Sequence, residues 1–133
     1  MMTLASLVAT WSKDPSTKVG AVIVDQKNRV VSLGFNGFPR SVKDSADVTR
    51  EVKLMCTIHA EENALLFASR SVAGCTVYVT HPPCAKCAAK LVQAEIARVV
   101  TVEPPSDFLE RWKDDLACTH SMFKEAGVSL EYF

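Results

Sequence analysis

The feature of this sequence that most constrains its fold is an alternation of short β-branched runs with segments of helical spacing. VGAVIVD (19–25) and VVSLGF (30–35) are separated by a polar QKNR turn, which predicts an antiparallel hairpin. Three later runs each follow a helical segment: CTVYVT (75–80), ARVVTV (97–102) and VSLEYF (128–133). Strands that alternate with helices in this way form a sheet whose faces are covered by the helices.

Helical spacing of apolar residues predicts four helices. They cover residues 1–12, the segment from His59 to Gly74, residues 84–95 and residues 106–126. The polar stretch from residue 42 to about residue 55 carries no pattern that assigns it. The chain of 133 residues is about the length of one domain, so we expect one domain over residues 1–133. Its expected fold is α/β, with about five strands in a mixed sheet and helices on both faces.

Charge and composition exclude several classes of partner. Lys plus Arg and Asp plus Glu number 15 each, and neither sign forms a run, which argues against a nucleic-acid or anionic-membrane partner. No apolar run exceeds about eight residues, far short of a membrane span. Five cysteines at irregular spacing indicate a reducing compartment. We therefore expect a soluble cytoplasmic protein that binds a small molecule.

Two of the predicted helices begin with residues that ligate metals, HAE (59–61) and CAKC (84–87). Cys84 and Cys87 lie at i and i+3 on one face of a helix start, where the helix dipole favours the thiolate that zinc requires. With His59 as a third ligand, the fourth tetrahedral position stays open to water. That arrangement is typical of catalytic zinc sites rather than structural ones.

Glu61 is predicted to be a general acid and base rather than a ligand. It lies two residues past His59, about 200° further round a helix, so both side chains reach one site only at the helix start. A carboxylate there can exchange protons with the water at the metal. H-x-E combined with P-C-x-x-C is the known signature of zinc-dependent nucleobase deaminases, and the assignment rests on that signature.

Three other interpretations of the cysteine pair are weaker. A helix holds such residues about 5 Å apart, so a disulfide is possible by distance, but a reducing compartment disfavours it. A purely structural zinc needs a fourth protein ligand, and Cys56, Cys75 and His81 lack a matching pair spacing. A thioredoxin-like redox pair would follow the first strand of its fold, not a late one.

The sequence resembles the deoxycytidylate (dCMP) deaminases of the cytidine deaminase-like superfamily over nearly its whole length. The matching stretches are SKDPSTKVGAVIV (12–24), GFNGFPR (34–40), HAEENAL (59–65), TVYVTHPPCAKCAAKLVQAEI (76–96) and EAGV (125–128). The resemblance implies a three-layer αβα fold and one Zn²⁺ per chain. It also implies hydrolysis of dCMP to dUMP and ammonia, in which Glu61 carries a proton to N3 of cytosine and then to the departing ammonia.

The resemblance also suggests how the nucleotide is held. Asn36 would contact a sugar hydroxyl and the Ala60 N–H would contact the base, although an Asn in this position can also be a turn residue. Candidates for the phosphate lie in the matching motifs and are Ser16, Thr17, Lys18 and Arg40.

Family members are associated with control by dCTP and dTTP and with homohexamers, so the resemblance implies these effectors, Mg²⁺ accompanying a dCTP effector, and a homo-oligomer, preferably a hexamer. The sequence departs from the family at one helix end. Glu95 replaces the usual glycine after Gln-Ala, which puts the left-handed turn at that point in question.

Several alternative functions stay open. Within the same chemistry they are deamination of a free nucleoside, of a modified cytosine nucleotide or of tRNA adenosine, the last of which the balanced charge disfavours. From a different class, a non-catalytic protein could bind dCTP or dTTP as a sensor. Glu61 argues against the sensor, because binding alone needs no proton carrier.

Overall fold

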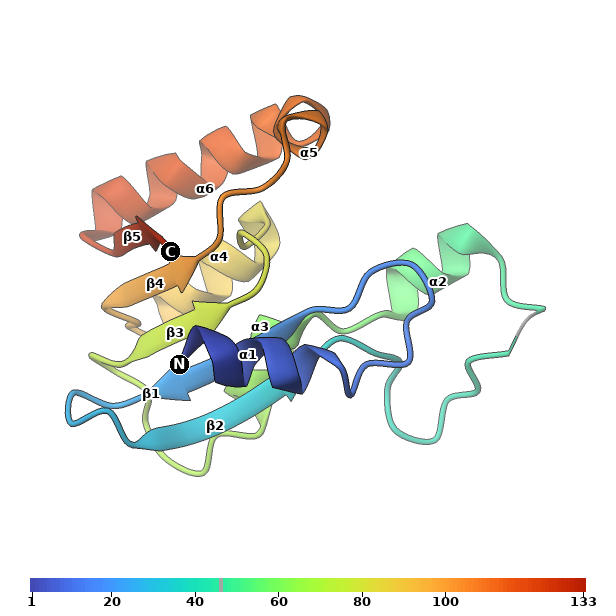
Figure 1. Ribbon diagram of the computed structural model, residues 1–133, viewed down its shortest axis with the longest axis horizontal. Helices are drawn as coiled ribbons and strands as arrows, with labels where there is room; N and C mark the ends of the chain where they lie inside the picture. Colours follow the sequence, from blue (N-terminus) through green and yellow to red (C-terminus); the bar gives the residue numbers. More distant parts are fainter. Residues whose placement is uncertain (46) are drawn as a thin grey trace.

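A computed structural model describes residues 1–45 and 47–133, which form a five-stranded mixed sheet covered by helices on both faces (Figure 1). The strands are β1 (Gly20–Val24), β2 (Val30–Phe35), β3 (Thr76–Val79), β4 (Arg98–Thr101) and β5 (Ser129–Tyr132). They lie side by side in the order β2-β1-β3-β4-β5. β1 is antiparallel to both β2 and β3, whereas β3, β4 and β5 are parallel. The predicted hairpin and mixed α/β sheet are confirmed.

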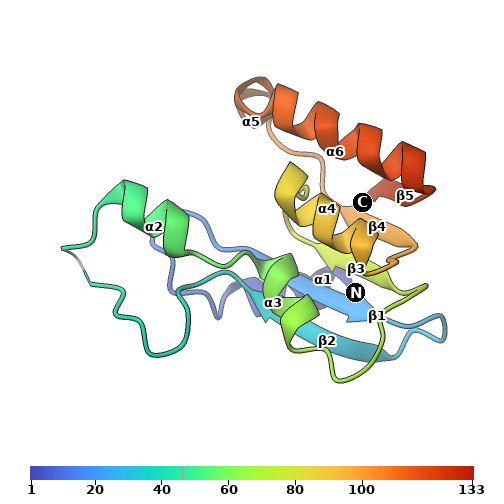
Figure 2. The same cartoon turned by 180° about the vertical axis from the view of Figure 1, so that it is seen from behind.

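The described helices are α1 (Met2–Ala9), α2 (Arg50–Cys56), α3 (Ala60–Leu66), α4 (Ala85–Gln93), α5 (Ser106–Arg111) and α6 (Lys113–Ala126). α1 packs on one face of the sheet, and α3 and α4 lie side by side on the other, where α6 packs against α4 (Figure 2). Among the described residues, no helix combines the length and apolar character that a membrane crossing needs.

β1 is buried on both faces, which explains its uninterrupted apolar sequence. Ala21 and Ile23 belong to the core beneath α3, α4 and α6, whereas Val22 and Val24 belong to the core beneath α1. On β2, Gly34 lets α3 approach closely, because a Cβ at this position would collide with the carbonyl oxygen of Ala60. The start of α3 is thereby held against the sheet.

The structure assigns the segment that the sequence pattern leaves open. Its residues 50–56 form α2, whose N-cap Thr49 accepts a hydrogen bond from the Val52 N–H. α2 has no buried residue and stands away from the sheet (Figure 1). A helix without a buried face needs no apolar periodicity, so the periodicity used to find the other helices fails here.

The prediction of one continuous helix over residues 106–126 is wrong. The chain leaves helical geometry at Trp112, with φ −110° and ψ 14°, and α5 and α6 run in different directions (Figure 1). Phe108 in α5 and Trp112 at the break lie with their ring centroids 6.0 Å apart. Phe108, Trp112 and Leu116 keep an i, i+4 spacing in the sequence, so periodicity alone does not reveal the break.

The left-handed turn after α4 is kept although glycine is absent. Glu95 has φ 65°, its N–H donates to the Val92 carbonyl, and the Ile96 N–H donates to the Leu91 carbonyl. This is the hydrogen-bond pattern of a Schellman helix end. Gly127 ends α6 with the same pattern at φ 74°. Glu95 therefore holds a backbone conformation that costs an L-residue free energy.

We predict that Glu95→Gly raises the free energy of unfolding by about 0.5 to 1 kcal/mol, because relief of the left-handed strain outweighs the added freedom of glycine in the unfolded chain. Chemical denaturation measures the change. Gly127→Ala is the matched control and should lower stability by about 1 kcal/mol, since a Cβ there meets no atom within 4 Å and only the backbone is strained. A Glu95→Gly protein that is no more stable contradicts the prediction.

Candidate metal centre and active site

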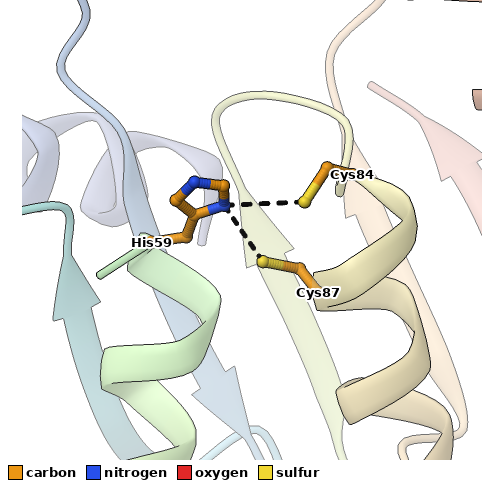
Figure 3. A group of neighbouring side chains, drawn as sticks. All are labelled: His59, Cys84 and Cys87. Carbon is orange, nitrogen blue, oxygen red and sulfur yellow. Dashed lines mark hydrogen bonds between the residues drawn. The ribbon is translucent and has the colours of Figure 1, made fainter. Parts of the chain in front are cut away.

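Two helix starts meet on the α3 and α4 side of the sheet (Figure 3). His59 is the N-cap residue of α3 and Cys84 is the N-cap residue of α4, with Cys87 in the first turn of α4. The start of α4 is fixed from α6: Asp115 accepts a hydrogen bond from the Ala85 N–H at 2.9 Å. The predicted convergence of HAE with CAKC is thus present in the fold.

The three side chains have the spacing of a metal site. His59 Nδ1 lies 3.2 Å from Cys87 Sγ and 3.5 Å from Cys84 Sγ (Figure 3), and the three ligand atoms lie within 4.8 Å of one another. A tetrahedral zinc with ordinary bond lengths separates a nitrogen ligand from a sulfur ligand by about 3.6 Å. The side chains therefore fit Zn²⁺ in number, donor type and spacing.

The cluster favours thiolate even without a cation. A hydrogen bond from the Cys87 thiol, followed by one from His59, lowers the pKa of Cys84 to about 4. The same hydrogen bond, together with burial, raises the pKa of Cys87. Cys84 is thus the thiolate of the pair, as expected for a sulfur at a helix start. A divalent cation would supply the charge that favours loss of the second proton.

Glu61 lies beside the cluster but outside the group of three. Its side chain belongs to the first turn of α3 and is 5% exposed. Burial raises the pKa of the Glu61 carboxyl to about 7. A carboxyl group with a pKa near neutrality can both accept and donate a proton, which suits an acid and base catalyst.

The cluster opens onto a cavity of about 410 Å³. Four residues predicted to bind the nucleotide line it together with His59, Glu61 and Cys84; they are Ser16, Thr17, Asn36 and Ala60. Lys18 and Arg40 are not among its lining residues. Arg40 instead lies 5.7 Å from the centre of the Phe67 ring and lines a second cavity of about 440 Å³. A phosphate role for Lys18 and Arg40 stays a prediction.

Asn36 is buried, and its side chain already bonds the backbone. Its Oδ1 accepts from the Val19 N–H and its Nδ2 donates to the Thr17 carbonyl, both at 2.9 Å. Asn36 thereby ties the end of β2 to the loop before β1. The predicted sugar contact stays a prediction, and it would have to use the second N–H of Nδ2 or the second lone pair of Oδ1, which these two bonds leave.

The DPST loop is likewise held by its own side chain. Asp14 Oδ1 accepts hydrogen bonds from the N–H groups of Ser16 and Thr17 and from the Ser16 hydroxyl. The loop is thus preformed at the mouth of the cavity, with Pro15 among the lining residues.

Sequence reasoning missed several residues of the cavity wall. Arg50 and Lys53 come from α2, a helix without apolar periodicity, and Arg111 comes from α5. His81, Phe108 and Trp112 form an aromatic strip on the same wall, with neighbouring centroids 6.3 Å and 6.0 Å apart. The H-P-P-C spacing was the one available signal for His81, because it places that side chain three residues before a ligand.

Comparison with known proteins points to one family. The sequence model of the cytidine and deoxycytidylate deaminase zinc-binding region matches residues 1–103. The chain is 52% identical over 130 residues to a deaminase of Aliivibrio fischeri, covering 97% of this chain and 88% of that protein. It is 35% identical over 140 residues to human deoxycytidylate deaminase, covering 99% of this chain and 76% of the human protein.

The fold leads to the same family. The dCMP deaminase of cyanophage S-TIM5, solved in complex with dCMP and dUMP, superposes with a TM-score of 0.80 at 26% identity. The match covers 99% of this chain and 93% of the phage chain. Sequence, fold and a His/Cys cluster suited to zinc agree, and this chain belongs to the cytidine and deoxycytidylate deaminase family.

Proposed function

We propose that residues 1–133 form one zinc-dependent deaminase domain that hydrolyses dCMP to dUMP and ammonia. The observation that carries the proposal is the clustering of His59, Cys84 and Cys87, together with a cavity that His59 and Cys84 line along with the buried carboxyl of Glu61. The human and phage relatives, which are named deoxycytidylate and dCMP deaminases, support dCMP as the substrate.

In the proposed reaction Glu61 carries the protons. It takes a proton from the water that attacks C4 of cytosine, passes it to N3, and then helps to protonate the amino group as the C4–N bond breaks. One water is consumed and one ammonia leaves, so the reaction is balanced. Burial supports this role because it raises the pKa of Glu61 to about 7. A carboxyl group with a pKa near the working pH can accept a proton in one step and donate it in the next.

His59, Cys84 and Cys87 would hold one Zn²⁺ per chain. Zinc bound by three protein ligands supplies a water molecule of lowered pKa at neutral pH. The Ala60 N–H, in the first turn of α3, is the proposed contact to the base, and Asn36 is the proposed contact to the sugar.

The phosphate needs cationic donors, and the cavity wall supplies three. Arg50 and Lys53 lie on α2, and Arg111 lies on α5. Lys53 is paired with Asp44 at 3.4 Å, and Arg111 is within 4.0 Å of Asp107, so both can exchange an exposed carboxylate for a phosphate. We propose Arg50 and Arg111 as the main phosphate contacts, with Ser16 and Thr17 at the preformed loop between them and the base.

Regulation and assembly stay proposals that follow from the family resemblance. They comprise control by dCTP or dTTP, Mg²⁺ accompanying a dCTP effector, a homohexamer and a cytoplasmic location. The second cavity, with Arg40 on its wall, offers one place where an anionic effector can be tested.

The substrate prediction compares three compounds. Ammonia release from dCMP should far exceed release from deoxycytidine and from dAMP, because only dCMP offers both a cytosine and a phosphate. Zinc is measured in the same sample by atomic absorption and should reach one ion per chain. Equal rates with dCMP and deoxycytidine would remove the phosphate from the specificity argument, and no release from any cytosine compound would favour the sensor.

The catalytic prediction separates proton transfer from metal binding. Glu61→Ala should keep the zinc and lose about 10² to 10⁴ in kcat, since general acid and base catalysis contributes about that factor. Cys87→Ala should lose the zinc together with the activity. Glu110→Gln, on an exposed face of α5, is the control for loss of a carboxylate. A Glu61→Ala enzyme of near-normal kcat contradicts the mechanism.

The phosphate prediction is a difference between two substrates. Arg50→Ala and Arg111→Ala should each raise KM for dCMP about tenfold, the effect of losing one charge-assisted hydrogen bond, and leave the weak reaction of deoxycytidine unchanged. Lys18→Ala and Arg40→Ala are measured alongside. If instead Lys18→Ala and Arg40→Ala raise KM for dCMP alone, and Arg50→Ala and Arg111→Ala do not, the phosphate assignment made from the sequence motifs is restored.

A further inference from the structure

Glu62, the neighbour of the proposed catalytic residue, contacts both helices that carry the metal ligands. Its Oε1 accepts a hydrogen bond from the His59 N–H at 3.1 Å, which closes the capping box at the start of α3. Its Oε2 accepts from the ammonium of Lys90 at 2.5 Å. Glu62 is therefore more than a solvent-facing residue of α3.

Lys90 lies on α4, three residues after Cys87, and residues so spaced occupy the same side of a helix. The Glu62–Lys90 pair thus joins the residue that caps α3 to the helix that supplies both sulfur ligands. α3 and α4 also pack against each other, and their core residues include the small side chains of Ala60, Ala64 and Ala88. Small side chains permit close approach of two helices, and the ion pair adds a polar contact that ties one helix to the other.

We propose that the Glu62–Lys90 ion pair is a brace that sets the distance between the His59 nitrogen and the two cysteine sulfurs, and so the affinity of the site for zinc. The inference rests on the zinc ligands assigned under the proposed function. Glu62 and Lys90 are positioning residues: the one acts on His59 through its backbone N–H, and the other acts on α4 as a whole. Groups that orient metal ligands in this way commonly change metal affinity 10- to 100-fold when removed.

Lys90→Met separates two effects on the zinc Kd, because loss of the charge and loss of the brace predict changes in opposite directions. If only charge matters, Lys90→Met should tighten zinc binding, because it removes the Coulomb repulsion between an ammonium group and the cation. If the pair is a brace, Lys90→Met should instead raise the zinc Kd roughly tenfold or more, because the contact that joins α4 to the capping residue of α3 is lost. The zinc Kd is measured at neutral pH by competition with a chromophoric chelator, on the full chain, after the metal-free proteins are shown to be folded by circular dichroism.

Further variants make the test specific. Lys90→Arg keeps the ion pair and should restore most of the affinity. Glu62→Gln keeps the acceptor for the His59 N–H but loses the charge that pairs with Lys90. The double variant Glu62→Gln/Lys90→Met should weaken zinc binding no more than Lys90→Met alone, because each change removes the same ion pair. Lys113→Met removes half of an exposed ion pair with Glu110 at 3.4 Å and should leave the zinc Kd unchanged.

An unchanged or lower zinc Kd in Lys90→Met, with the wild-type chain binding one zinc, overturns the brace and leaves the proposed function standing. The brace is also overturned if the effects of Glu62→Gln and Lys90→Met on the free energy of zinc binding add fully in the double variant. A wild-type chain that binds no zinc overturns both the brace and the proposed function.

Discussion

The close packing of α3 against the sheet and against α4 is the constraint on which the site depends. Gly34 on β2 leaves no side chain between the strand and the backbone of Ala60, so the N-terminus of α3 comes to lie at a fixed height above the sheet. The start of α4 is fixed separately, by Asp115 through the Ala85 N–H and by the Thr119 hydroxyl, which donates to the Pro83 carbonyl. Two helix starts held from different sides can then share one metal ion.

The same packing produces the electrostatics of the site. Burial that holds α3 in place also removes water from the Glu61 carboxyl, which raises its pKa toward neutrality. At the start of α4, in contrast, hydrogen bonds from Cys87 and from His59 lower the pKa of Cys84. Two acids 23 residues apart in sequence are thereby shifted in opposite directions within one cavity. The fold thus places the proposed proton carrier beside a thiolate of the proposed metal site.

Much of this arrangement can be predicted from the sequence, for reasons that particular residues make clear. β1 to β4, α3 and α4 have buried faces, so apolar periodicity reveals them, and the spacing of His59, Cys84 and Cys87 indicates their shared chemistry. α2 cannot be recognised in this way because none of its residues is buried. The break at Trp112 cannot be recognised because Phe108, Trp112 and Leu116 keep the i, i+4 spacing of a helix on both sides of it. Ion pairs between helices, such as Glu62 with Lys90, carry no local signal at all.

These differences divide the molecule into two parts with different physical demands. The residues of the proposed chemistry lie on α3 and α4, whose buried faces pack against the sheet. Reacting groups must be held to within fractions of an ångström, and such packing provides that. The proposed phosphate contacts lie on α2 and α5, which have no buried residues. Long cationic side chains tolerate such supports, since a charge attracts a phosphate over a broader range of positions than a proton transfer allows. Substitutions on α2 and α5 can therefore change the nucleotide that is recognised without disturbing the metal ligands, whereas substitutions between α3 and α4 cannot.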